Sequence, residues 1–366
     1  MDLLKSARTS FAKDFADSRK RFLAAAKAAK APVKSYANPN KGPNGEALAT
    51  DCAWLGPKNA ETVLVLLSGT HGVEAFCGTG CIMDVWKARP KLPKGMAILA
   101  VHAINPHGFA WIRRVTEEGV DLNRNFVDFK NPPANPGYDE LADAILPPAL
   151  EGPAYEAAQK KIADYRAKHG VAGLHVAFSG GQYKHAKGLF FGGFGPAWSH
   201  RTHAAIIGDH DLAKRKHVGV IDYHTGLGPH GYGELICVHL PGTAAVARAK
   251  AWWGANVTEP LAGTSIAGAR HGFGCRIWEQ MLGDRMTFIT IEYGTYDTLS
   301  VVRPALVADH WLHAQGPVDW KDKRTQAIKR RLKDAMYADT DDWREAVLWR
   351  SRQVIRMTAA GLAREK

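Results

Sequence analysis

Four segments of the chain are almost continuously apolar, and they restrict the fold more than any other feature. They are residues 61–67 (ETVLVLL), 96–104 (MAILAVHAI), 217–223 (HVGVIDY) and 287–293 (TFITIEY). Strands of this kind are buried on both faces and occur mainly in parallel sheets that helices cover. Because helical segments separate them, the pattern predicts an α/β fold with a mostly parallel or mixed central sheet and helices on both faces.

The segments outside the sheet indicate how the chain is organised. An amphipathic N-terminal helix is expected, followed by a Pro- and Gly-rich loop between Pro32 and Gly45. A helix over 154–169 should end at Gly170, and the glycine-rich residues 178–195 are expected to form a rim over a site.

We predict one catalytic domain over residues 1–315 and a helical C-terminal extension over 316–366 that packs on it. The domain includes the N-terminal helix and a rim insertion at about 127–215. In the extension, Asp341 is expected to cap the last helix.

The composition restricts which partners and which cellular location are expected. The formal charge of the 366 residues is +12, but no zinc-finger spacing, RNP-like aromatic signature or helix-turn-helix pattern accompanies it, so we expect no nucleic-acid partner. No apolar run reaches the roughly 18 residues of a membrane span, so no membrane partner is expected. Five scattered cysteines without a secretion signal favour reduced thiols and a cytoplasmic location. The oligomeric state stays open.

Polar residues that can bind a metal or transfer a proton follow the apolar segments at their carboxyl ends. His71 and Glu74 follow the first segment, His224 follows the third, and Glu292 lies near the end of the fourth. In an open α/β sheet, ligands bind beyond the carboxyl ends of the strands. Two imidazoles and one carboxylate fill three positions on zinc and leave a fourth for water. Glu292 is then the carboxylate available to take the proton of that water.

Three further observations bear on this site. A lone His-x-x-Glu pair is more often a surface or helix-capping pair than a metal site, so the other segments carry the prediction. In VDLNRNF (residues 120–126), Asn123 and Arg124 could hold a substrate carboxylate through paired hydrogen bonds. Asp222 is expected to face the side of its strand opposite to His224.

The motifs THGVE, NPHGFAWIRRV with GVDLNRNF, DYHTGLG and IEYGT together resemble the zinc carboxypeptidase superfamily. The sequence looks closest to its aspartoacylase/succinylglutamate desuccinylase-like side and to M14-type metallopeptidases with a DUF2817 domain. The similarity covers roughly residues 10 to 300, with the motifs in the family's order. It implies His71, Glu74 and His224 as the ligands of one Zn²⁺ per chain, and Glu292 as general base and acid.

The resemblance also implies how a substrate is held. Asn123 and Arg124 would anchor its carboxylate, and an arginine just before DLNR would stabilise the oxyanion. Both Arg113 and Arg114 stand there; Arg114 is preferred for the oxyanion, and Arg113 remains a substrate-binding candidate. The tyrosine that carboxypeptidases place near the catalytic glutamate has only Tyr293 and Tyr296 as candidates, by proximity.

We therefore predict a zinc-dependent hydrolase that cleaves an amide bond next to a free carboxylate. Its substrate would be a small molecule or short peptide, and a carboxypeptidase and an N-acyl amino acid deacylase remain open. The β-rich C-terminal domain of aspartoacylases is replaced here by helical sequence, which leaves the substrate undetermined. The alternative is a non-catalytic binding protein of the same fold whose basic surface holds an anionic ligand.

Overall fold

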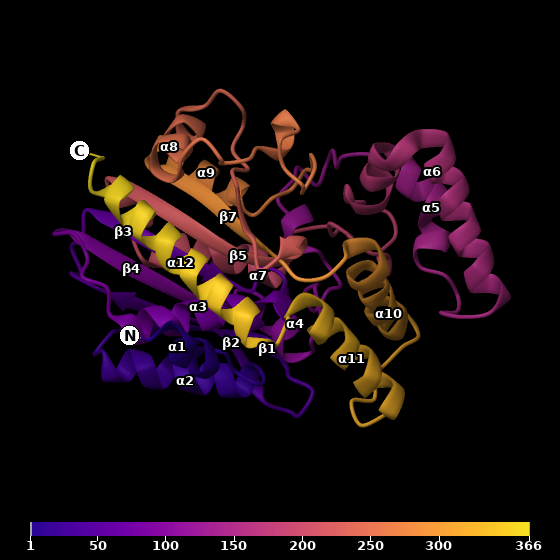
Figure 1. Cartoon of the computed structure of the whole chain (residues 1–366), viewed down its shortest axis with the longest axis horizontal. Coiled ribbons are helices and arrows are strands. Elements are labelled where there is room, and N and C mark those ends of the chain that lie inside the picture. The colour runs from indigo at the N-terminus through magenta and orange to yellow at the C-terminus, as the bar shows by residue number, and fades with distance from the viewer. Residues whose placement is uncertain (1, 366) are drawn as a thin grey trace.

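The computed structural model describes residues 2–365, which form a mixed seven-stranded sheet in the order β1-β2-β4-β3-β5-β7-β6 (Figure 1). The four central strands, β4, β3, β5 and β7, are parallel, and β1, β2 and β6 are antiparallel to their neighbours. The strands are β1 (Val33–Lys41), β2 (Ala47–Leu55), β3 (Thr62–Ser68), β4 (Met96–His102), β5 (His217–His230), β6 (Gly233–Ile236) and β7 (Met286–Gly294).

The four parallel strands coincide with the four apolar segments, which confirms the predicted α/β class. Their register sets the position of the site. Ser68 at the end of β3 pairs with Tyr223 of β5, and His224 pairs with Glu292 of β7. The carboxyl ends of β3, β5 and β7 therefore meet at one edge of the sheet.

Helices cover both faces of the sheet, as predicted, and each face has its own apolar core. One core joins Leu64, Ile98 and Ile289 to α1, α2, α3, α8 and α12, and the other joins Val65 and Leu99 to α7 and α9. The helices are α1 (Leu3–Ser10), α2 (Phe15–Ala28), α3 (Ala75–Ala88), α4 (Pro106–Ala110), α5 (Pro136–Ile145), α6 (Pro153–Ser179), α7 (Trp198–Asp209), α8 (Ala244–Trp253), α9 (Cys275–Leu282), α10 (Arg303–Ala314), α11 (Lys323–Met336) and α12 (Asp341–Leu362).

The predicted loop between Pro32 and Gly45 is wrong, because β1 and β2 form an antiparallel hairpin there. Proline lacks the N–H that a strand interior needs, and it is tolerated at sheet edges and irregularities. Pro39 lies in β1, which is the edge strand, and the pairing with β2 is interrupted between Ala37 and Lys41. Pro39 is therefore compatible with β1, although the Pro and Gly residues in this segment favour a loop.

The C-terminal helices share the core of the main domain. In Figure 1, α12 runs along the face of the sheet that also carries α3, and its Trp343 and Val347 are fully buried there. Asp341 is the first residue of this helix, and Thr340 precedes it as the cap residue. The boundary proposed at residue 315 stays a prediction. The N-terminal segment forms two helices, α1 and α2, rather than one.

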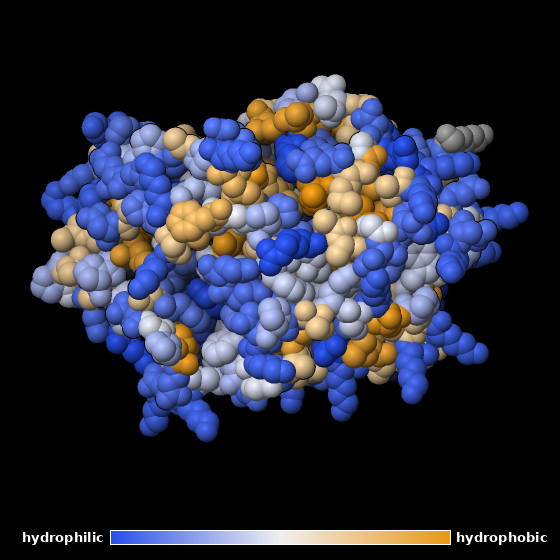
Figure 2. All heavy atoms as spheres, turned by 180° about the vertical axis from the view of Figure 1, so that it is seen from behind, coloured by the Kyte–Doolittle hydropathy of each residue, from blue (hydrophilic) through white to orange (hydrophobic). Residues whose placement is uncertain are grey.

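Helices α5 and α6 form a hairpin that stands away from the sheet beside α10 (Figure 1). Gly170 has φ 71° and interrupts α6, which confirms the predicted helix end at this glycine. The face opposite to that of Figure 1 is covered mostly by hydrophilic side chains with small apolar groups between them (Figure 2). Within residues 2–365 no helix is both long and apolar enough to cross a membrane.

Candidate active site

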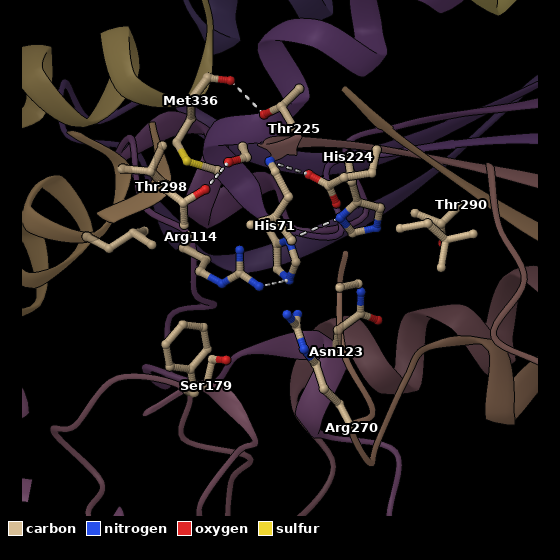
Figure 3. Close-up of a pocket in the computed structure, with 18 of the residues that line it drawn as sticks. His71, Arg114, Asn123, Ser179, His224, Thr225, Arg270, Thr290, Thr298 and Met336 are labelled. Carbon is tan, nitrogen blue, oxygen red and sulfur yellow. Dashed lines mark hydrogen bonds between the residues drawn. The ribbon is translucent and has the colours of Figure 1, made fainter. Parts of the chain in front are cut away.

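The three side chains predicted to bind zinc converge at the carboxyl edge of the parallel strands. The Nδ1 atoms of His71 and His224 are 3.1 Å apart (Figure 3). They lie 2.8 and 3.0 Å from the two carboxylate oxygens of Glu74. All three side chains are buried, and one ligand atom from each lies within 4.8 Å of the others. Donors from the segment after β3 and from β5 thus face a common point.

Two aspartates contact the imidazoles on the side away from the shared point. Asp121 Oδ1 lies 3.2 Å from His71 Nε2, and Asp222 Oδ2 lies 2.8 Å from His224 Nε2. The Thr70 hydroxyl donates to both oxygens of Asp222. The expectation that Asp222 faces away from His224 is therefore wrong, because residues two apart on a strand point to the same face.

The tight turn between β3 and α3 requires glycine at two positions. Gly69 has φ 73°, a left-handed conformation that side chains disfavour. A Cβ on Gly72 would lie 2.1 Å from the backbone carbon of Gly108, so the turn packs directly against the segment after β4. This contact fixes the approach of His71 and Glu74 to the end of β5.

This donor set fits a zinc ion. Zinc binds histidine nitrogen and carboxylate oxygen, and ligand histidines commonly donate their other N–H to a carboxylate. Asp121 and Asp222 lie on the Nε2 side of His71 and His224, so Nδ1 is the nitrogen of each ring at the shared point; the Arg114 NH2 group also lies 2.7 Å from His71 Nε2. The chemistry of the residues present therefore matches the predicted site.

Glu292 lies beside these ligands at the end of β7. Its Oε1 atom accepts a hydrogen bond of 3.1 Å from the Leu227 N–H, and the side chain lines the same cavity as His71 and His224. Burial, reinforced by the negative charge of Glu74, raises the pKa of Glu292 to about 8. A carboxyl group held in this way suits proton transfer near neutral pH.

The two adjacent arginines predicted near the oxyanion separate in the structure. Arg114 lines the cavity, where its guanidinium contacts His71, Glu74 and Asp121 at 2.7 to 3.1 Å. Arg113 is buried and its Nε lies 3.5 Å from Asp309 of α10. The structure thus brings Arg114 to His71 and Glu74, two of the predicted ligands, and directs Arg113 toward the C-terminal helices.

The predicted carboxylate anchors, Asn123 and Arg124, also reach the cavity, but they differ in how many of their hydrogen-bond donors are already used. Asn123 Oδ1 accepts the Gly274 N–H at 2.9 Å, and the Asn123 amide nitrogen donates no hydrogen bond within residues 2–365. The terminal nitrogens of Arg124 donate to the carbonyls of Asn123 and Ser179 at 2.9 and 2.7 Å. Arg124 is therefore largely committed to the fold.

The two candidate tyrosines lie outside the cavity. The Tyr293 hydroxyl donates to the Val347 carbonyl, and Tyr296 is 41% exposed.

Arg270 is a cavity residue that sequence reasoning missed. It lies in the loop before α9, and its guanidinium points into the cavity beside Asn123 (Figure 3). Its Nε has no hydrogen-bond partner among the described residues, and its NH2 group has only a 3.4 Å contact with His175 Nε2. Burial, together with the charges of Arg124 and Arg114, lowers the pKa of Arg270 to about 9. No strand or motif precedes this residue, so no local signal marks it.

A second group of potential metal ligands, His239, Cys275 and Glu279, is satisfied within the protein. His239 Nδ1 lies 2.7 Å from Glu279 Oε1, and its Nε2 accepts the Phe288 N–H at 2.9 Å. Arg276 also pairs with Glu279. These hydrogen bonds account for the cluster without a metal.

The fold and the site define the chain as an α/β protein with a His-Glu-His cluster, a candidate metal site, at the carboxyl ends of parallel strands. The family described as "Protein of unknown function (DUF2817)" matches residues 11–350, and the chain belongs to this family. This agrees with the resemblance inferred from the motifs. No curated protein sequence matches the chain.

Solved structures similar to this chain include metallocarboxypeptidases and aspartoacylase-family proteins. The metallo-carboxypeptidase from Pseudomonas aeruginosa, solved with (2-guanidinoethylmercapto)succinic acid, is 13% identical over 87% of this chain and 66% of its own, with a TM-score of 0.39. Thrombin activatable fibrinolysis inhibitor is 11% identical over 97% and 77%, with a TM-score of 0.48. An aspartoacylase family protein from Mesorhizobium loti is 20% identical over 80% and 68%, with a TM-score of 0.37.

The chain spans 66% of the length of the Pseudomonas carboxypeptidase, slightly under two thirds. At TM-scores below 0.5 these likenesses carry no inference about activity.

Proposed function

We propose that this protein is a zinc-dependent hydrolase that cleaves an amide bond next to a free carboxylate. The observation that carries the proposal is the convergence of His71, Glu74 and His224 on one point, with aspartates behind both imidazoles and Glu292 beside them. One Zn²⁺ per chain would be held by these three residues, as the three-ligand pattern of catalytic zinc requires. When bound, zinc lowers the pKa of water and polarises a carbonyl.

Glu292 is the proton carrier of the proposed reaction. Its Oε1 atom is engaged by the Leu227 N–H, so Oε2 is the oxygen that accepts a proton from the attacking water. The same oxygen then delivers that proton to the nitrogen of the leaving amine, as general acid–base catalysis requires. The water oxygen first bonds to the carbonyl carbon, which places negative charge on the carbonyl oxygen, and the C–N bond then breaks as the nitrogen takes the proton from Glu292. One water is consumed, and protons and electrons balance without a further reactant.

Arginines supply the positive charge that the substrate needs. Arg114, at the ligand side of the cavity, would stabilise the negative charge that develops on the carbonyl oxygen. Asn123 and Arg124 would hold the substrate carboxylate, and we add Arg270 to this pair because its Nε has no partner within residues 2–365 and its NH2 group has a single 3.4 Å contact. A carboxylate bound away from the scissile bond positions the carbonyl for attack.

Metal analysis and paired substrates test the proposal together. We expect about one zinc per chain and hydrolysis of short peptides or N-acyl amino acids, with the free acids preferred over the corresponding amides. Zinc binding without any hydrolysis across such a panel would instead favour a non-catalytic binding protein. Equal rates on the acid and amide forms would remove the carboxylate anchor and leave a broader amidohydrolase.

A further inference from the structure

A second, larger cavity lies next to the one lined by His71 and His224. It lies between α6 and α10 and has a volume of about 630 Å³, compared with about 100 Å³ for the cavity beside His71. The two share His175, Phe178 and Arg303 in their walls, so they are adjacent. The smaller cavity has room for little beyond the reacting group, whereas about 630 Å³ is within the range of sites that enclose whole ligands.

The charged residues of this larger cavity, which we call the α6–α10 cleft, are all cationic. Arg166, Arg303 and Arg331 line it, and no aspartate or glutamate does. None of the three arginines makes an ion pair or hydrogen bond with any residue in 2–365; Arg303 instead lies 4.1 Å over the ring centroid of Phe178. Burial and the charge of Arg166 lower the pKa of Arg303.

Like charges around one partly enclosed space repel each other, and anionic groups of a ligand would relieve that repulsion. Elsewhere on the same hairpin, Lys160 and Lys161 pair with Asp164 and Asp143. What sets the cleft apart is that three unpaired arginines surround one space whose lining contains no acidic residue.

Most of the remaining cleft wall is apolar, although Gln159 and His175 also line it. Ile162, Leu174 and Val307 line it, together with Val171 and Leu299, which are 63% and 53% exposed. Large apolar side chains left this exposed beside a cavity are typical of surfaces that bind a ligand. A ligand for the cleft thus combines several separated anionic groups with a chain that can lie against apolar side chains.

We propose that the α6–α10 cleft binds the body of an acidic oligopeptide whose terminal residue enters the smaller cavity. This inference rests on the proposed hydrolase and deepens it, because a peptide with several acidic side chains can reach all three arginines, whereas a small N-acyl amino acid cannot. The protein is then a carboxypeptidase for acidic peptides. Arg303 stands at the junction of the two cavities, where the chain passes toward the metal ligands.

Direct binding tests the cleft separately from catalysis. The zinc-loaded Glu292→Gln variant is titrated into the fluorescein-labelled peptides Glu-Glu-Glu-Glu-Ala and Gln-Gln-Gln-Gln-Ala, and anisotropy is measured at low and high salt. We expect the acidic peptide to bind at least roughly tenfold more tightly at low salt, and this advantage to shrink as salt screens the charges. Equal affinity for the two peptides would overturn the proposal.

Charge reversal on the cleft localises the effect. Arg166→Glu and Arg331→Glu should each weaken binding of the acidic peptide by roughly three- to tenfold and leave the glutamine peptide unchanged. Lys168→Glu is the matched control, because Lys168 is on the same helix but lines a different surface depression, between α5 and α6. An equal loss in the control would show general attraction to a basic protein and overturn the cleft. Equally tight binding of an oligodeoxynucleotide would do the same.

Failure of the cleft and failure of the hydrolase give different results. Hydrolysis of neutral substrates with no preference for acidic peptides would keep the hydrolase and remove the cleft as a peptide site. Tight, arginine-dependent binding of the acidic peptide by a parent protein that hydrolyses neither peptide would keep the cleft and remove the hydrolase.

Discussion

The carboxyl edge of the sheet and the α6–α10 cleft differ in how their polar groups are satisfied. At the sheet edge, each imidazole of the ligand pair is held by an aspartate, and Asp222 is in turn held by Thr70. In the cleft, Arg166 and Arg331 make no hydrogen bond or ion pair within residues 2–365. The first arrangement fixes geometry before a ligand arrives, as a metal site and proton carrier need. The second keeps donors free for a ligand to use.

The largest expected effect is loss of metal from the fixed region. His224→Ala should reduce bound zinc to background after dialysis, because the two remaining ligands cannot form a closed coordination set. His230→Ala, in the same strand, is the control and should retain about one zinc per chain. Full zinc content in the His224 variant, measured by atomic emission, would show that the metal centre is assigned to the wrong residues.

Glu292→Gln should abolish proton transfer and leave the metal in place. Loss of a general acid–base group lowers kcat by roughly 10²–10⁴-fold. Glu234→Gln is a close control, because Glu234 pairs with Glu292 across β6 and β7 but does not line the cavity. Steady-state kinetics and zinc content of both variants decide the matter, and a kcat near that of the parent would exclude Glu292 as the proton carrier.

Much of the fixed region follows from sequence because its signals are local. The four parallel strands are apolar runs, and His71, Glu74, His224 and Glu292 come directly after or at the end of them. A buried strand followed by polar residues predicts both a sheet edge and the groups gathered there.

The remaining features depend on contacts between distant segments. Arg270 lies in an irregular loop and reaches the cavity only through the fold. The cleft joins α6 to α10 and α11, and more than 120 residues separate α6 from these two helices in the sequence. No local pattern therefore predicts its three arginines. Asp222 is a different case, because its strand is predicted correctly. Residues two apart on a strand point to the same face, so strand alternation itself places Asp222 beside His224.

Asp222→Asn tests whether the groups behind the ligands matter as much as the fixed arrangement implies. Replacing an outer carboxylate of a ligand histidine typically costs 10–100-fold in metal affinity. Competition with a chelator should show a loss of roughly this size, and Thr70→Val, which removes only the hydroxyl that donates to Asp222, should show a smaller one. Unchanged affinity in the Asn variant would mean that Asp222 does not orient His224.

Acid titration tests the buried contact that joins the sheet edge to the C-terminal helices. Asp309 lies 2.5 Å from Lys329 and 3.5 Å from Arg113, and although burial opposes ionisation, these cations lower the pKa of Asp309 to about 2. A carboxyl group with a lowered folded pKa stabilises the protein above its unfolded pKa of about 4, and the effect is lost as pH falls toward 2. The shift corresponds to about 2 kcal/mol in the free energy of unfolding.

Asp309→Asn should therefore lower the free energy of unfolding by more at pH 6 than at pH 2.5, with about 2 kcal/mol between the two differences. Urea unfolding at both pH values measures this, and exposed Asp334→Asn, on the helix that carries Lys329, is the control. A destabilisation independent of pH would show that Asp309 acts through its shape alone.

The smallest expected effect separates two arginines that line one cavity. Arg124 donates to two backbone carbonyls and belongs to the fixed region, whereas Arg270 has one weak contact and resembles the arginines of the cleft. Arg270→Gln should leave the free energy of unfolding nearly unchanged and lower the preference for free-acid over amidated substrate by about tenfold in kcat/KM, the worth of one charge-assisted hydrogen bond. Arg124→Gln should lower that free energy, because the Ser179 carbonyl loses its donor. If Arg270→Gln reduced the rates on the acid and the amide by the same factor, Arg270 would not bind the carboxylate, and the positive charge in the cavity would serve another part of the substrate.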